Sequence, residues 1–96
     1  LIQADVILIA TPEYIHSIPA VLKNLFEWTV ASGEFYEKHV AVWTAQAASQ
    51  YVLPQVMDIL RTMTAFVVDE ASGQVAPGDE PEMQRRLEAL VVAASP

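Results

Sequence analysis

Residues 5–24 read DVILIATPEYIHSIPAVLKN. The first six contain a continuous apolar run rich in β-branched residues, which is typical of a parallel strand covered on both faces. Pro12 predicts a turn, and Ser17 and Pro19 predict the start of a helix, with Ser17 as its cap. Loops at the carboxyl ends of parallel strands line the ligand crevice of an open α/β sheet. The loop that follows residue 10 is therefore expected to line a binding site.

The rest of the chain repeats this alternation of strand and helix. Hydrophobic periodicity and the Gly and Pro positions predict strands at 39–44 and 65–68, and helices at 17–33, at 51–63 and from 79 to the end. Asp79 and Glu82 suit a capping box at the start of the last helix, after a loop at 72–78. The order β-α-β-α-β-α implies an α/β fold with a parallel sheet and right-handed crossovers.

Composition narrows the classes of function. The chain has 96 residues, of which 53% are hydrophobic, and a formal net charge of -7. This charge has the wrong sign for binding nucleic acid, and every apolar run ends before the length of about 18 residues that a membrane span needs. The absence of cysteine excludes disulfides and thiolate metal sites and fits a cytoplasmic location. The high apolar content favours self-association, so we expect a homodimer or homotetramer.

A longer segment carries a family resemblance. Residues 4–28, ADVILIATPEYIHSIPAVLKNLFEW, resemble the central segment of the NAD(P)H-dependent FMN reductase family, where the usual string is close to TPEYN-x-SIPG-x-LKN-A-x-DW. The chain keeps TPEY, SIP, LKN and Trp28 at matching positions. The resemblance implies a flavodoxin-like three-layer parallel sheet, here a partial unit. It also implies an oxidoreductase in which NADH or NADPH reduces FMN, and the flavin passes electrons to a small acceptor such as a quinone, chromate, an azo compound or free flavin.

The resemblance also places the cofactor. In the family, the loop that matches residues 12–15 runs beside the flavin ring, and the next cofactor loop matches the residues after the 39–44 strand. This implies FMN contacts at Pro12, Glu13, Tyr14, Ile15, Thr44, Ala45 and Gln46. Because the flavin itself performs hydride transfer, the protein supplies shape, backbone donors and stacking surfaces, and we expect no catalytic side chain and no metal ligand.

Three departures from the family pattern limit what the resemblance implies. The family's phosphate-binding loop, rich in Ser, Arg and Gly, has no counterpart in this sequence. The segment AQAAS at 45–49 lacks the glycines that let that loop approach the flavin, and Ile15 replaces the usual asparagine. The sequence also opens directly on a strand, without an initiator methionine. We therefore interpret 1–96 as a single partial flavodoxin-like domain that lacks the N-terminal phosphate-binding half, and whose 5–10 strand lies at a sheet edge.

An alternative function stays open at this point. Without a phosphate loop, the chain could be a non-catalytic association module that does not retain FMN and that keeps the half-sheet and the apolar surface around Leu22, Leu25 and Trp28. The turn at Glu13 and Tyr14 could likewise be an ordinary exposed turn. Aromatic residues such as Trp43 could stack on a ligand, although a core role is the commoner one.

Overall fold

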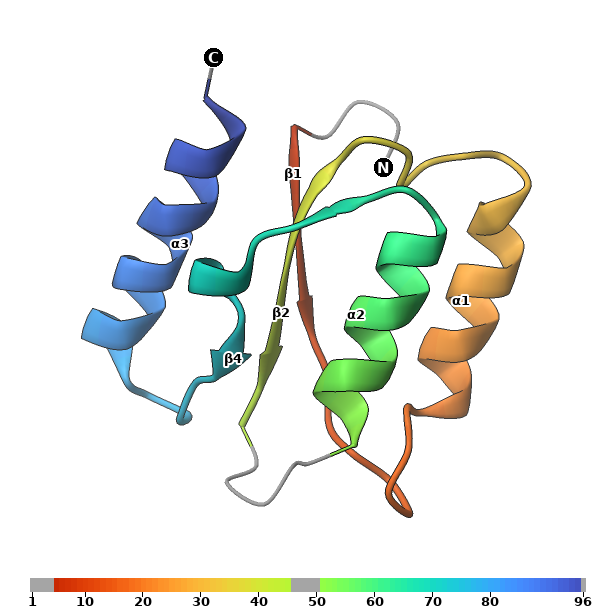
Figure 1. The fold of residues 1–96 in the computed structure, drawn as a ribbon. Coiled ribbons are helices and arrows are strands. Elements are labelled where there is room, and N and C mark those ends of the chain that lie inside the picture. Colours follow the sequence, from red (N-terminus) through yellow and green to blue (C-terminus); the bar gives the residue numbers. More distant parts are fainter. Residues whose placement is uncertain (1–4, 46–50, 96) are drawn as a thin grey trace.

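The computed structural model describes residues 5–45 and 51–95, which are built around one parallel sheet (Figure 1). Its strands are β1 (Val6–Ala10), β2 (His39–Thr44), β3 (Phe66–Val67) and β4 (Gly73–Gln74). All of β1 pairs with one edge of β2. On the other edge, β3 pairs with the start of β2 and β4 with its end, and the short 3-10 helix η1 (Asp69–Ala71) lies between them in the chain. β3 and β4 are thus two ends of one interrupted strand.

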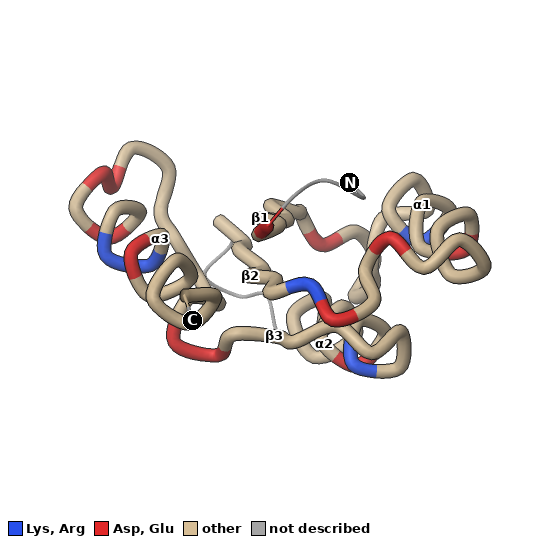
Figure 2. Tube along the Cα trace, turned by 90° about the horizontal axis from the view of Figure 1, so that it is seen from above, with Lys and Arg blue, Asp and Glu red and all other residues tan. Residues whose placement is uncertain are grey.

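Helices cover both faces of the sheet. α1 (Ala20–Val30) and α2 (Val52–Thr62) lie side by side on one face, and α3 (Glu80–Ala94) lies on the other. The view from above in Figure 2 shows the resulting three layers, with the strands between the helix pair and α3. The predicted α/β fold with a three-layer parallel sheet is confirmed.

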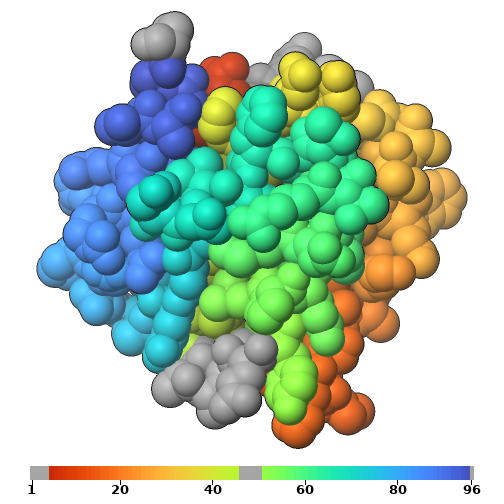
Figure 3. Space-filling view, viewed as in Figure 1, coloured from red at the N-terminus to blue at the C-terminus, as the bar shows by residue number. Residues whose placement is uncertain are grey.

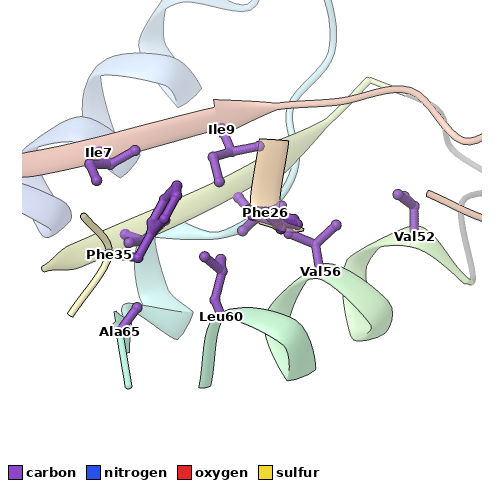
Figure 4. Packing of buried hydrophobic residues seen from close by; sticks show 10 residues of the cluster. Ile7, Ile9, Phe26, Phe35, Val52, Val56, Leu60 and Ala65 are labelled. Carbon is purple, nitrogen blue, oxygen red and sulfur yellow. The ribbon is translucent and has the colours of Figure 1, made fainter. Parts of the chain in front are cut away.

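The larger hydrophobic core lies between the sheet and the helix pair (Figure 4). Successive side chains of a strand face opposite sides, so alternate residues of β1 and β2 point into this layer. The helix α2 contributes three completely buried side chains on one face, because they are spaced four residues apart. The strands contribute Ile7, Ile9, Val40 and Val42 to this core, and the three side chains from α2 are Val52, Val56 and Leu60. Phe26 and Phe35 pack edge to face beside them, with ring centroids 5.6 Å apart.

A smaller core lies between the sheet and α3. Leu90 of α3 packs there with Ala41 of β2 and with Val68 and Ala71. Arg86, one turn before Leu90, donates from Nη1 to the carbonyl of Ser72 and so anchors α3 to the segment between η1 and β4. Figure 3 shows the longer segment 66–75, which includes β3, η1 and β4, lying between α2 and α3 on one face of the molecule.

Two helix starts differ in part from the sequence prediction. Pro19, not Ser17, occupies the cap position of α1, and the Ser17 hydroxyl donates to Gln55 Oε1 at 3.2 Å instead. The predicted cap was wrong because a closed turn precedes Ser17 and directs its side chain toward α2. At α3, Asp79 Oδ1 accepts from the Glu82 N–H at 3.3 Å as predicted, but the Glu82 carboxylate binds arginines of its own helix and does not complete a capping box.

The position of β1 agrees with the prediction of an edge strand. Within residues 5–45 and 51–95, no strand pairs with its outer side, and Leu8 in its centre remains 40% exposed. The loop predicted at 72–78 also contains β4, which periodicity did not indicate. In the described part of the chain, no helix has the length and apolar character needed to cross a membrane.

Candidate functional site

A hollow of about 410 Å³ lies at the carboxyl ends of β1 and β2, where the topology predicts a ligand crevice. One wall comes from the end of β1 and the loop after it, the second from the end of β2, and the third from the chain between β4 and the first turn of α3. The lining residues are Ala10, Thr11, Pro12, Trp43, Thr44, Ala45, Val75, Pro77 and Met83. Most of these side chains are apolar, so the hollow suits a flat, largely apolar group.

Hydrogen bonds hold the first two walls together. The Thr11 N–H donates to the Trp43 carbonyl at 3.0 Å and thereby extends the pairing of β1 and β2 beyond the end of β1. The Thr11 hydroxyl donates to the Pro12 carbonyl at 3.0 Å. The Trp43 indole N–H donates to the Ala71 carbonyl at 2.8 Å, so this buried ring is fixed in orientation. The ends of β1 and β2 and the Trp43 ring are therefore held in place by hydrogen bonds where they line the hollow.

The loop after β1 contains a closed two-residue turn. The Tyr14 N–H donates to the Ser17 carbonyl at 3.0 Å, and the Ser17 N–H donates back to the Tyr14 carbonyl at 2.9 Å. The two residues between them have positive φ, 50° at Ile15 and 55° at His16, as a turn of type I′ requires. Asparagine and glycine adopt this conformation easily, whereas a β-branched residue such as isoleucine does so with strain.

This turn is fastened to the N-terminal end of α2. Glu13 Oε1 accepts hydrogen bonds from the backbone N–H groups of Tyr51 at 2.9 Å and Val52 at 2.8 Å. Gln55 Oε1 accepts from the Ile18 N–H at 3.0 Å, and the His16 ring stacks on Tyr51 with centroids 4.5 Å apart. The Glu13 carboxylate thus faces a helix terminus and stabilises it.

The structure distributes the residues predicted to contact the flavin among three environments. Pro12, Thr44 and Ala45 line the hollow. Glu13 faces α2, while Tyr14 and Ile15 lie on the turn with 61% and 99% of their surface exposed, outside the lining of the hollow. Gln46 falls outside the described residues.

The third wall was missed by sequence reasoning. Val75, Pro77 and Met83 come from the region predicted as a loop and from the first turn of the last helix. Their role depends on β4 pairing with the end of β2, and a two-residue strand leaves no periodic pattern in the sequence. The Pro and Gly content of 72–78 indicated a loop but not which edge of the sheet it joins.

Charged groups gather beside this third wall, on α3. The guanidinium groups of Arg85 and Arg86 donate to the carboxylate of Glu82, and these hydrogen bonds lower the pKa of Glu82 below its ordinary value. The same contact raises the pKa of Arg85. Glu82 is therefore ionised at neutral pH, and its charge is balanced locally on the helix.

Comparison with known proteins identifies the family. The sequence profile of the family described as NADPH-dependent FMN reductase matches residues 1–78, which is most of the chain. The chain belongs to this family. The resemblance of residues 4–28 to FMN reductases is therefore confirmed. The hollow is accordingly compared with the flavin of that family below.

Solved structures with the same fold include a flavodoxin from the domain Archaea and the WrbA-like flavodoxin from Agrobacterium tumefaciens. The first has a TM-score of 0.74 and 17% identity, and the second a TM-score of 0.69 and 18% identity. The two matches cover 96% and 95% of the present chain, but only 65% of each solved chain. At this level of identity they establish the flavodoxin-like fold alone.

A curated relative matches a shorter segment. The NADH:(hydroxy)cinnamate reductase subunit CrdA of Vibrio ruber is 69% identical over 26 residues, which is 27% of this chain and 13% of the relative. The present chain thus spans about two thirds of the length of the solved structures it resembles, and its match to the curated relative spans a small part of that protein's length.

The residues at the hollow fit the ring portion of FMN. The volume of the hollow lies within the usual range of small-molecule sites, about 300–1,000 Å³. The apolar walls suit a flat tricyclic ring, and the exposed Ala45 leaves room at the rim where a larger side chain would intrude. No basic residue is found among the described residues that line the hollow, so these walls fit the ring and not the phosphate.

Proposed function

We propose that this chain binds the isoalloxazine ring of FMN in the hollow at the carboxyl ends of β1 and β2, as part of an oxidoreductase. The whole protein would transfer electrons from NADH or NADPH through FMN to a small acceptor of the quinone, chromate, azo or free-flavin class. The observation that carries this proposal is that Thr11 and Pro12, the first two residues of the TPEY motif, line the same apolar hollow as the end of β2. The use of a nicotinamide nucleotide is supported by the family alone.

When bound, FMN supplies the hydride and electron chemistry. The chain's own residues have a binding role: Pro12 belongs to the wall after β1, and Trp43, Thr44 and Ala45 form the wall at the end of β2. The hydrogen bond from the Trp43 indole to the Ala71 carbonyl fixes the orientation of this ring in the wall formed by the end of β2. This assignment requires no acid, base or metal ligand from the protein.

An FMN titration of the full chain tests the proposal. Binding in the hollow quenches flavin fluorescence and perturbs its visible absorption spectrum. Ala45→Trp places a large ring at the rim and should weaken FMN binding by at least about tenfold. Ala93→Trp is the matched control, because Ala93 is an exposed alanine near the far end of α3. Equal affinity of the two variants, or no binding by the wild type at high FMN concentration, would refute this function.

A second candidate, an association module that does not retain FMN, is favoured by one surface. Val21, Leu25 and Trp28 of α1 follow one another at helical spacing and are 84%, 41% and 76% exposed, although all are large and apolar. This stripe suits a protein contact, which would make the chain a homodimer or homotetramer. Light scattering during the FMN titration separates the two functions. A module would assemble without binding FMN, and Trp28→Glu would dissociate it.

A further inference from the structure

The N-terminus of α2 receives its cap from a distant part of the chain. The first backbone N–H groups of a helix have no partner within the helix. In the described part of α2, the residue at the cap position, Tyr51, makes no side-chain hydrogen bond to the helix. Glu13 provides the acceptor instead, from 38 residues earlier in the sequence, and its carboxylate is favourably placed at the positive end of the helix dipole.

The contact also runs in the opposite direction. Gln55, at the end of the first turn of α2, uses its Oε1 to accept from the Ile18 N–H and the Ser17 hydroxyl. The loop therefore caps the helix through Glu13, and the helix orders the loop through Gln55. We call this set of contacts between Glu13, Gln55 and their backbone partners the loop clamp.

The loop clamp holds a backbone that would otherwise relax. Ile15 and His16 both have positive φ, and such strained residues persist only when the surrounding structure determines their conformation. Glu13 lies before this turn and Ile18 after it, so the clamp holds both of its ends. Pro12, the lining residue at the rim of the hollow, directly precedes Glu13 in the chain.

We propose that Glu13 is a positioning residue for the flavin site. Its carboxylate fixes the TPEY loop against α2. It thereby sets the position of Pro12, in the first wall of the hollow, relative to the second wall at the end of β2. The effect on FMN rests on the proposed function, whereas the coupling between loop and helix is a property of the chain itself. This role differs from the direct flavin contact expected from the sequence, because the carboxylate is directed at Tyr51 and Val52.

Three variants of the full chain test the proposal. Glu13→Ala removes the acceptor, Glu13→Gln keeps an acceptor of the same length without its charge, and Glu88→Ala is a control that removes an exposed carboxylate on α3, away from the loop clamp. Amide hydrogen exchange is measured at Val52 and at Ile18, with the amides of β2 as the internal reference. FMN affinity and the visible circular dichroism of bound FMN are measured in parallel.

Glu13→Ala should speed exchange at both Val52 and Ile18 by about tenfold relative to β2, as expected for loss of hydrogen bonds to a charged acceptor. It should also weaken FMN binding by about tenfold and change the dichroism of the bound flavin, with Glu13→Gln intermediate and Glu88→Ala like the wild type in both. Ile18 is informative because it is bonded to Gln55 and not to Glu13.

The outcomes separate the two proposals. If exchange rises at Val52 but not at Ile18, Glu13 is only a helix cap and the coupling is refuted. If both amides loosen while the affinity and dichroism of FMN stay unchanged, the positioning role is refuted and the proposed function stands. If the wild type binds no FMN, the proposed function and the positioning role both fail, while the exchange data still decide whether the loop clamp exists.

Discussion

Replacing Ile15 by asparagine should stabilise the protein. Ile15 is 99% exposed, so the substitution removes no buried apolar surface, but its φ of 50° lies in the left-handed region. For an ordinary side chain this conformation costs about 1–2 kcal/mol, and asparagine tolerates it far better. We expect Ile15→Asn to raise the free energy of unfolding by about 1 kcal/mol. In a domain of this size, that corresponds to an increase in Tm of about 4–8 °C.

The assay is thermal unfolding followed by circular dichroism, with urea unfolding at 25 °C as a second measurement. The urea midpoint should rise with an unchanged m-value, because the surface exposed on unfolding stays the same. Val92→Asn is the matched control: this valine is 72% exposed on α3, with ordinary helical φ, and valine and asparagine have similar helix propensities. Its Tm should stay near that of the wild type. Equal shifts for both variants would refute the assignment of strain to the turn.

Two further variants probe α3 and the segment it covers. Because Arg85 and Arg86 hold the pKa of Glu82 below its ordinary value of 4.5, the carboxylate stabilises the fold above that value, and this contribution is lost as the pH falls through the lower folded pKa. Glu82→Gln should therefore flatten the decline of Tm in acid, and an unchanged profile would contradict this. Gly73→Ala should cost about 2 kcal/mol in urea unfolding, because φ is +138° and the new Cβ would lie 3.1 Å from Arg86 Nη1. Gly33→Ala, with φ of +75° and open space around it, should cost about 1 kcal/mol, and equal losses would refute the steric part.

The sequence predicted the elements with strong periodicity. The strand at 39–44 coincides with β2, and the helix at 51–63 differs from α2 by one residue at each end. β2 is a continuous apolar run buried on both faces, and α2 buries a stripe at helical spacing, so in both elements the sequence pattern follows the burial. The strand predicted at 65–68 is confined to Phe66–Val67, and η1 follows it from Asp69. β4 escaped prediction because Gly73 and Gln74 form no apolar pattern.

The location of the site was predictable, but the direction of its side chains was not. Parallel topology places the ends of β1 and β2 together, and the family resemblance implied that Pro12, Thr44 and Ala45 contact the cofactor; all three line one hollow. The partners of Glu13 lie on α2, and nothing in the local sequence shows that its carboxylate reaches them. Contacts between segments far apart in the chain depend on tertiary packing, which periodicity does not contain.

Besides the α1 stripe, the open edge of β1 bears on both candidate functions. β1 has the apolar composition of an interior strand, yet within the described residues its outer edge carries no partner, and Leu8 remains partly exposed. The carboxyl end of the same strand leads into Thr11 and Pro12 at the hollow. A strand added in parallel to β1 would cover its edge and bring its own carboxyl-end loop beside these residues. Association at β1 and completion of the flavin site are therefore geometrically linked, so the apolar edge does not by itself favour an association module over a reductase.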